Sequence, residues 1–189
     1  MAHYRFMIDS SLIFHEFADC LWIRCTSRGC FINSPSLKTI ADHYLMQGGA
    51  HIVVDLELCP GVDSTFMGTL AGIARRCIAA DGELAIASPT ARTRAAMETL
   101  GLDFLVNIDP PEAAWQADIA SRREVLAQDT TALEDQEQLS EVERTRHVLD
   151  AHNTLRAINK QNDAAFGYVC ETLEEDLRRH NSGEDNAQA

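Results

Sequence analysis

The sequence predicts an α/β protein with a mixed sheet, on three observations. Short apolar runs without a helical period, typified by residues 52–56, indicate buried strands. Stretches with apolar residues three and four positions apart lie between these runs and indicate amphipathic helices. Turn signals such as Pro60-Gly61 separate the two kinds of segment. Strands that alternate with helices after an initial strand pair predict a sheet with helices packed on it.

The first part of the chain supplies the initial strands and one helix. Apolar patches at residues 4–8 and 12–14 predict a strand or hairpin, and residues 20–26 predict the next strand, which Ser27-Arg28-Gly29 ends as a turn. Asn33-Ser34-Pro35 is a helix-start signal, with Ser34 as the cap and Pro35 in the first turn. The helix is expected to stop at Gly48-Gly49.

A strand, a loop and a helix over residues 50–78 form the centre of the chain. The β-branched run in residues 51–56 predicts the strand, and residues 57–62 predict the loop. Three N-cap candidates, Asp63, Ser64 and Thr65, then precede an apolar face at helical spacing. A hydroxyl at a helix start lies among unpaired backbone N–H groups and a partial positive charge, which can accommodate a phosphate.

The remaining elements of this region follow the same alternation. After Asp81-Gly82, residues 84–87 predict another strand, and Ser88-Pro89-Thr90 predicts the start of a helix through Leu100 that Gly101 ends. Residues 104–106 predict a last short strand. Pro110-Pro111 marks a boundary.

At the central unit the sequence resembles the STAS family, which includes bacterial anti-sigma factor antagonists and sulfate-transporter tails. The family pattern is a strand ending in Asp, a loop, Asp-Ser-Ser/Thr and a glycine on the next helical turn. Here it appears as Ile52–Leu56 and Asp63–Gly68, although Phe66 stands where the family usually has a glycine. The resemblance spans about residues 4–108 and includes Gly29 before the first helical region. It implies a mixed sheet of four to five strands with helices mainly on one side.

The resemblance also implies a regulatory site. In antagonists of the family, a partner kinase phosphorylates the serine that directly follows the aspartate, which is Ser64 here. The residues alone favour a plain N-cap for Ser64; with the resemblance the phosphoacceptor and the cap become comparable, and the two roles are compatible. Thr65 is the alternate acceptor, and Asp63 caps the helix or holds the loop so that Ser64 faces outward. The expected partner-binding residues are Asp63, Ser64, Thr65, Phe66, Met67 and Gly68.

The chain divides by composition into an expected STAS domain at residues 1–110, an acidic amphipathic helical extension at 111–180 and a disordered tail at 181–189. Residues 113–126 predict one helix. A stripe of residues three or four apart then predicts one long helix, or a pair broken near Gly167: Val142, Leu149, His152, Leu155, Ile158, Asn162, Phe166, Val169, Leu173 and Leu177. The stripe must bury against its own domain, a second copy in a homodimer, or a partner.

Some side chains have structural interpretations beside functional ones. Asp55, at the end of the central strand, is expected to be a solvated or loop-bonded carboxylate. His147 and His152 are five residues apart, which disfavours a metal site, and His152 is interpreted as a packed or hydrogen-bonded interface residue. Trp22 and Trp115 are expected to be core or interface anchors.

Composition excludes several classes of function. The net charge is −13, and residues 111–189 alone hold 17 acidic against 8 basic residues, which disfavours nonspecific binding to nucleic acid or anionic membranes. The six cysteines have neither zinc-site spacing nor the density of a disulfide framework, so buried reduced thiols are expected. The chain shows no signal peptide, membrane span or catalytic motif, which predicts a cytoplasmic protein that is not an enzyme and has no cofactor or metal.

Two functions from different classes fit these observations. The first is a non-enzymatic regulator that binds a protein partner through the helix start at Ser64, with phosphorylation switching the binding. By resemblance, the partner is an anti-sigma factor or serine kinase of the histidine-kinase-like ATPase fold. The alternative is a constitutive adaptor or scaffold subunit, for example accessory to a transporter ATPase, that assembles through residues 112–180.

Overall fold

The computed structural model describes residues 11–128 and 139–182, and it contains a five-stranded sheet in the order β1-β2-β3-β4-β5. The first strand is antiparallel to the second, and the remaining neighbours are parallel. This arrangement confirms the predicted mixed α/β sheet. The apolar patch at residues 4–8 lies outside the described residues. The strands are β1 Leu12–Glu16, β2 Leu21–Cys25, β3 His51–Asp55, β4 Glu83–Ala87 and β5 Asn107–Ile108.

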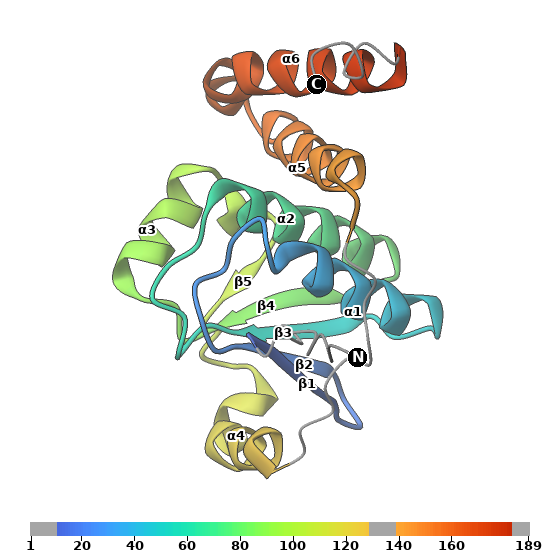
Figure 1. Cartoon of the computed structure of the whole chain (residues 1–189). Coiled ribbons are helices and arrows are strands. Elements are labelled where there is room, and N and C mark those ends of the chain that lie inside the picture. Colours follow the sequence, from blue (N-terminus) through green and yellow to red (C-terminus); the bar gives the residue numbers. More distant parts are fainter. Residues whose placement is uncertain (1–10, 129–138, 183–189) are drawn as a thin grey trace, which may run out of the picture.

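Helices cover the two faces of the sheet unequally (Figure 1). Helices α1 (Ser34–Met46), α2 (Ser64–Ala79) and α3 (Ala91–Thr99) lie on one face, and α4 (Ile119–Gln128) lies on the other. The domain therefore has its helices mainly on one side, as predicted. Because parallel strands need crossover connections, α1, α2 and α3 each carry the chain from one parallel strand to the next.

The sheet separates two apolar cores. The larger core lies between the sheet and the three helices, and its fully buried members include Ile23, Val54, Phe66, Leu70 and Ile86. The smaller core lies under α4, where the indole rings of Trp22 and Trp115 meet edge to face with centroids 5.3 Å apart. Both tryptophans are thus core anchors, which confirms one of their two predicted roles. The six cysteines are thiols, and five of them are buried.

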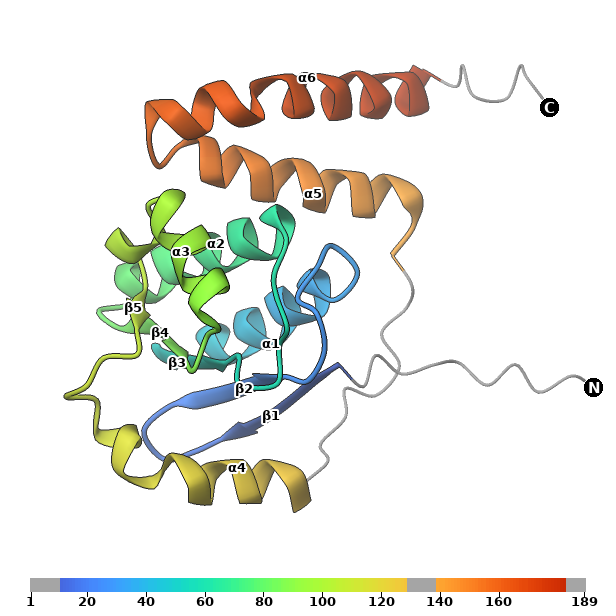
Figure 2. The same cartoon turned by 90° about the vertical axis from the view of Figure 1, so that its left-hand side faces the viewer.

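The C-terminal part forms a short 3₁₀ turn and three helices. The expected helix over residues 113–126 begins later, because the 3₁₀ turn η2 (Ala114–Asp118) precedes α4. Helices α5 (Glu141–Arg156) and α6 (Lys160–Ser182) then form a hairpin, with α5 lying on α2 and α6 lying on α5 (Figure 2).

The predicted break near Gly167 is wrong, because Gly167 lies inside α6. The chain turns at residues 157–159 instead. Asn159 caps the start of α6, since its side-chain oxygen accepts a hydrogen bond of 2.8 Å from the backbone N–H of Asn162. Helix α6 also extends to Ser182, past the start of the predicted tail; residues 183–189 lie outside the described part.

Two further local predictions are wrong. Residues 104–106 do not form a strand: Leu102–Phe104 is a 3₁₀ turn, η1, and the last strand comes later and has only two residues. The N-cap of α1 is Asn33 rather than Ser34, which is the first helical residue and is fully buried. Ser34 is held by a distant part of the chain, since its hydroxyl lies 2.9 Å from Nε2 of His147, and Leu102 is a buried member of the larger core.

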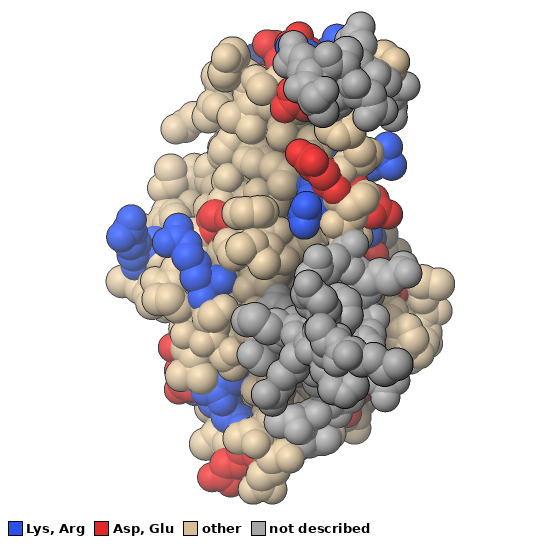
Figure 3. Space-filling model, in the orientation of Figure 1, with Lys and Arg blue, Asp and Glu red and all other residues tan. Residues whose placement is uncertain are grey.

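The surface carries charges of both signs. Figure 3 shows Lys and Arg side chains over α3, whose basic residues are Arg92 and Arg94, and acidic side chains interspersed elsewhere on this face. No helix within residues 11–128 and 139–182 is long and apolar enough to cross a membrane.

Candidate functional site

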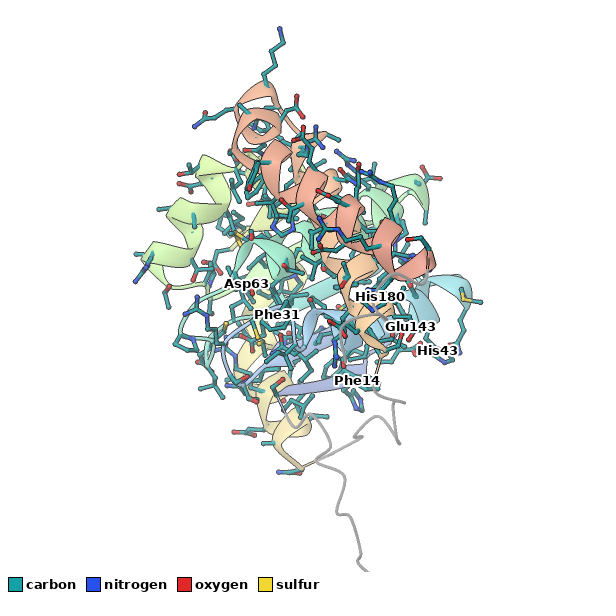
Figure 4. All side chains as sticks on the ribbon, turned by 45° about the horizontal axis from the view of Figure 1, so that its top comes forward. Phe14, Phe31, His43, Asp63, Glu143 and His180 are labelled. Atoms are coloured by element: carbon teal, nitrogen blue, oxygen red, sulfur yellow. The ribbon has the colours of Figure 1, made fainter. Side chains whose placement is uncertain are left out.

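The predicted strand, loop and helix meet at the carboxyl end of β3, where α2 begins. Asp63 caps this helix: one carboxylate oxygen accepts the backbone N–H of Phe66 at 2.8 Å, and the other accepts the N–H of Phe31 at 3.0 Å. Figure 4 shows Asp63 and Phe31 next to each other. Asp63 therefore caps the helix, as predicted, and also ties the helix start to the loop between β2 and α1.

The loop before α2 is fixed against Gly29. The backbone of Gly29 donates to Gly61 at 3.1 Å and accepts from Asp63 at 2.9 Å. A Cβ atom at Gly29 would lie 2.9 Å from the ring of Phe66, which is fully buried. Only a glycine allows this close approach, so Gly29 makes room for the ring of Phe66.

Ser64 is the first residue of α2 and is half-buried. Its hydroxyl oxygen does not cap the helix; it lies 3.0 Å from Nε2 of His152 in α5. The four residues that follow it, Thr65 to Gly68, are buried. Of the six predicted partner-binding residues, only Asp63 and Ser64 thus reach the surface in this arrangement.

His152 is oriented so that it accepts a hydrogen bond from the Ser64 hydroxyl. Its Nδ1 lies 2.8 Å from the carbonyl oxygen of Val148, which can only accept, so Nδ1 carries a hydrogen. In the neutral imidazole Nε2 is then the acceptor, and the Ser64 hydroxyl donates to it. The ring also packs on Phe166 of α6, with centroids 5.3 Å apart. The prediction of a packed or hydrogen-bonded His152 is confirmed.

Helix α5 approaches α2 closely along one line of contact. A Cβ atom at Gly68 would lie 2.2 Å from the backbone oxygen of Ala151, so the two backbones meet there. One turn of α5 earlier, Nε2 of His147 lies 2.9 Å from the Ser34 hydroxyl and 3.3 Å from the Thr69 hydroxyl. Burial, reinforced by the charge of nearby Lys38, lowers the pKa of His147 below its ordinary value, which keeps the imidazole neutral.

The expectation of a solvated Asp55 is wrong, because its side chain is completely buried. Arg123 of α4 holds it with two hydrogen bonds, Nε to Oδ2 at 2.8 Å and Nη2 to Oδ1 at 2.9 Å. The same guanidinium donates to Glu57 at 2.6 Å and to the Ser88 hydroxyl at 2.9 Å, while Arg24 lies 3.7 Å from Asp55. The backbone N–H of Glu57 also donates to Asp55 at 3.0 Å, which confirms the loop-bonded part of the prediction.

Reasoning from the sequence missed two of these contacts. His147 and Arg123 act across 113 and 68 positions of the chain, on Ser34 and Asp55, and neither has a local signal. The apolar stripe included His152, but it did not predict the contact between His152 and Ser64.

The geometry makes Ser64 a hydroxyl at a positive helix terminus, with its proton directed at an imidazole. A model of the STAS domain matches residues 12–114. The chain belongs to the STAS family. The match covers the sheet with α1 to α3 and ends before α4, so the helical hairpin lies beyond it.

Three solved structures of bacterial proteins are similar to this chain. A proposed anti-sigma factor antagonist from Thermotoga maritima is 20% identical with a TM-score of 0.51, and the likeness covers 59% of this chain and 95% of that chain. An anti-sigma factor antagonist from Mycobacterium paratuberculosis is 16% identical with a TM-score of 0.49, over 59% of this chain and 92% of that chain. The phosphorylated Bacillus cell fate determinant SpoIIAA is 18% identical with a TM-score of 0.47, over 59% and 99%.

At 20% identity the Thermotoga likeness shows the fold. A search among curated proteins gives no match. Within the described ranges, no group of three His, Cys, Asp or Glu side chains is placed to hold a metal ion.

Proposed function

We propose that this STAS protein is a non-enzymatic regulator, similar to anti-sigma factor antagonists, whose partner binding is switched by phosphorylation of Ser64. The partner is an anti-sigma factor or serine kinase of the histidine-kinase-like ATPase fold. The observation that carries the proposal is the position of Ser64, the first residue of a helix capped by Asp63, at the family's phosphoacceptor position.

The chemistry of the helix start supports this role. A phosphate on Ser64 would add about −1.5 to −2 charges at neutral pH, next to backbone N–H groups and the positive end of the α2 dipole. The same modification would reverse the character of a surface that a partner contacts, because three charged oxygens would replace one hydroxyl. A single covalent change at this position is therefore an effective switch.

Apolar side chains beside the site support a protein as the partner. Phe31 is 49% exposed, Ile32 68% and Leu58 51%, and they belong to the loops that flank the start of α2. The hydrogen bond from Phe31 to Asp63 connects one of these loops directly to the helix cap. Aromatic and aliphatic side chains grouped at a polar centre are typical of protein interfaces.

Labelling with γ-³²P ATP in an extract of the cells that make the protein tests the acceptor. Wild-type protein, Ser64→Ala and Ser121→Ala are compared. Ser121 is a matched control, because it is exposed and lies in the first turn of another helix, α4. We expect Ser64→Ala to lose the label and Ser121→Ala to keep it. Equal labelling of all three proteins would refute Ser64 as the acceptor.

The kinase responsible for this labelling, purified from the extract, is then used to test the switch. Its dissociation constant is measured for Ser64→Ala, Ser64→Asp and the control Ser121→Asp, which adds the same charge elsewhere. We expect Ser64→Asp to bind at least about tenfold more weakly than Ser64→Ala, a difference of about 1.4 kcal/mol. Equal binding by these two variants would show that charge at Ser64 does not switch the interaction.

The second candidate, a constitutive adaptor or scaffold, is favoured by one observation: the α5–α6 hairpin lies beyond the family match and is a separate addition to the STAS domain. A homodimer through residues 112–180 stays a prediction of this alternative. Light scattering on the full-length protein over a range of concentrations tests it. A monomer at all concentrations would count against the scaffold, and a stable dimer would favour it.

A further inference from the structure

We propose that the α5–α6 hairpin is a detachable cover on the Ser64 site, so that docking of the hairpin and modification of Ser64 exclude each other. This regulation rests on the proposed function of Ser64, and it goes beyond the STAS family match, which ends at residue 114. The hairpin would compete with the kinase and the partner for the start of α2.

The docked hairpin leaves no space for a phosphate on Ser64. The Ser64 hydroxyl lies 3.0 Å from Nε2 of His152, and His152 is itself buried. A phosphoryl group cannot fit into a hydrogen-bond gap of this length, and α5 already packs tightly on α2, because a Cβ atom at Gly68 would lie 2.2 Å from the backbone oxygen of Ala151. A kinase must also bring its ATP phosphate in line with the hydroxyl. Both requirements need α5 to move away.

Hydrogen bonds and apolar packing hold the hairpin on the domain. Hydrogen bonds join it to the domain: Ser64 to His152, Ser34 to His147, and the Asn162 amide to the carbonyl of Leu100 at 2.9 Å. Apolar packing by Leu155, Ile158 and Phe166 adds to them. Interfaces of this mixed character between parts of a chain are compatible with relative motion.

Helix α4 is held differently. Arg122 pairs with Asp19 at 2.9 Å, and Arg123 pairs with the buried Asp55 at 2.8 Å. Breaking such a pair leaves a buried charge uncompensated, which makes detachment of α4 unfavourable. The chain thus combines one helix fixed by ion pairs with a hairpin docked mainly by hydrogen bonds and apolar packing, beside an attraction between Asp150 of α5 and Lys38 of α1, and it is the hairpin that covers the site.

Part of the surface around Ser64 stays accessible to a partner when the hairpin is docked. With the hairpin docked, residues Thr65 to Gly68 are buried, while Phe31, Ile32 and Leu58 remain exposed. A partner can touch the flanking loops in this state but cannot reach the first turns of α2. The apparent affinity of the partner is then its intrinsic affinity multiplied by the fraction of molecules in which the hairpin is detached.

Thiol labelling in the full-length protein measures the cover directly. Ser64→Cys places a thiol at the site, and its reaction with N-ethylmaleimide is followed by mass spectrometry, with fragment ions separating it from Cys59 in the same tryptic peptide. Ala151→Glu puts a carboxylate into the closed contact with Gly68 and is expected to release α5. Asn153→Glu is the control, because it adds the same charge on the exposed side of α5.

We expect Ala151→Glu to accelerate labelling at position 64 by about tenfold or more over the Ser64→Cys parent, since labelling tracks the open fraction. Asn153→Glu is expected to leave the rate within about twofold of the parent. Equal rates in all three proteins would overturn the proposal. Far-UV circular dichroism checks that each variant remains folded.

A second pair of variants alters α2 instead, in case Ala151→Glu fails to fold. Gly68→Ala places a methyl group 2.2 Å from the Ala151 oxygen, whereas Gly72→Ala, one turn later in α2, meets nothing within 4 Å. Both substitutions improve helix propensity, so they differ only in the clash. Faster labelling in Gly68→Ala alone supports the cover, and equal rates in the two variants refute it.

Kinase labelling of the same hairpin variants, with Ser64 restored, separates failure of the cover from failure of the proposed function. Phosphorylation that is equally fast in Ala151→Glu, Asn153→Glu and wild type would refute the cover and leave the function intact. If no variant is phosphorylated, the proposed function fails, and the maleimide rates still decide whether the hairpin covers position 64.

Discussion

Replacing Arg123 with methionine would remove the cation that balances Asp55 inside the protein. The change deletes two hydrogen bonds to Asp55, one to Glu57 and one to Ser88. Asp55 would keep only the N–H of Glu57 at 3.0 Å and Arg24 at 3.7 Å. Methionine preserves the length and helix propensity of the side chain, so the loss is mainly electrostatic.

The size of the effect follows from the burial of Asp55, whose side chain has no exposed surface. Removing one partner of a buried ion pair costs about 3–5 kcal/mol. Arg24 remains nearby and compensates part of the charge, so we expect about 3 kcal/mol, at the lower end of this range. With a urea m-value of about 2 kcal/mol/M, the unfolding midpoint would fall by about 1.5 M.

Urea unfolding followed by tryptophan fluorescence measures this change, because Trp22 and Trp115 lie in the core under α4. Arg75→Met is the matched control: Arg75 is exposed, and its loss should cost no more than about 0.5 kcal/mol. In the double variant with Asp55→Asn we expect a coupling energy of about 2 kcal/mol. An Arg123→Met midpoint equal to that of Arg75→Met would refute the claim that this pair fixes α4.

Two further predictions concern α2 and its cover. Asp63→Ala should lower the free energy of unfolding by about 1–2 kcal/mol, because α2 loses its cap; a change below about 0.3 kcal/mol in urea unfolding would contradict this. Burial and Lys38 lower the pKa of His147 from 6.5, so its contribution to stability is full above about pH 6.5 and is lost as pH falls through the lower, folded-state pKa. Urea midpoints at pH 7.5 and 5.5 should therefore differ more in wild type than in His147→Gln, and an equal difference would contradict the assignment.

Local patterns were enough to predict most of the domain. Residues 51–56 and the capped helix after Asp63 appear as expected, because a β-branched run and an apolar stripe at helical spacing each have one dominant interpretation. The same holds for Thr90, which caps α3 by accepting the N–H of Thr93 at 3.1 Å. These elements depend on neighbours within a few residues.

The failures share a different cause. Asp55 ends a strand and is followed by a loop, which favours solvent until Arg123 arrives from 68 positions away. Ser34 looks like a cap beside Pro35, yet its hydroxyl is used by His147. The turn at 157–159 did have a local signal, since Asn159 is a good N-cap, but Gly167 attracted the break instead. Long-range pairing of polar groups cannot be derived from spacing in one sequence.

Phosphopeptide mass spectrometry on protein purified from its own cells shows whether Ser64 accepts a phosphate. Trypsin releases Ser64 and Thr65 together in the peptide Thr39–Arg75, where fragment ions distinguish the two hydroxyls. We expect phosphate on Ser64 in at least one growth or stress condition. Phosphate on Thr65 alone, or none on this peptide under any condition, would contradict it and shift the function to the α5–α6 hairpin.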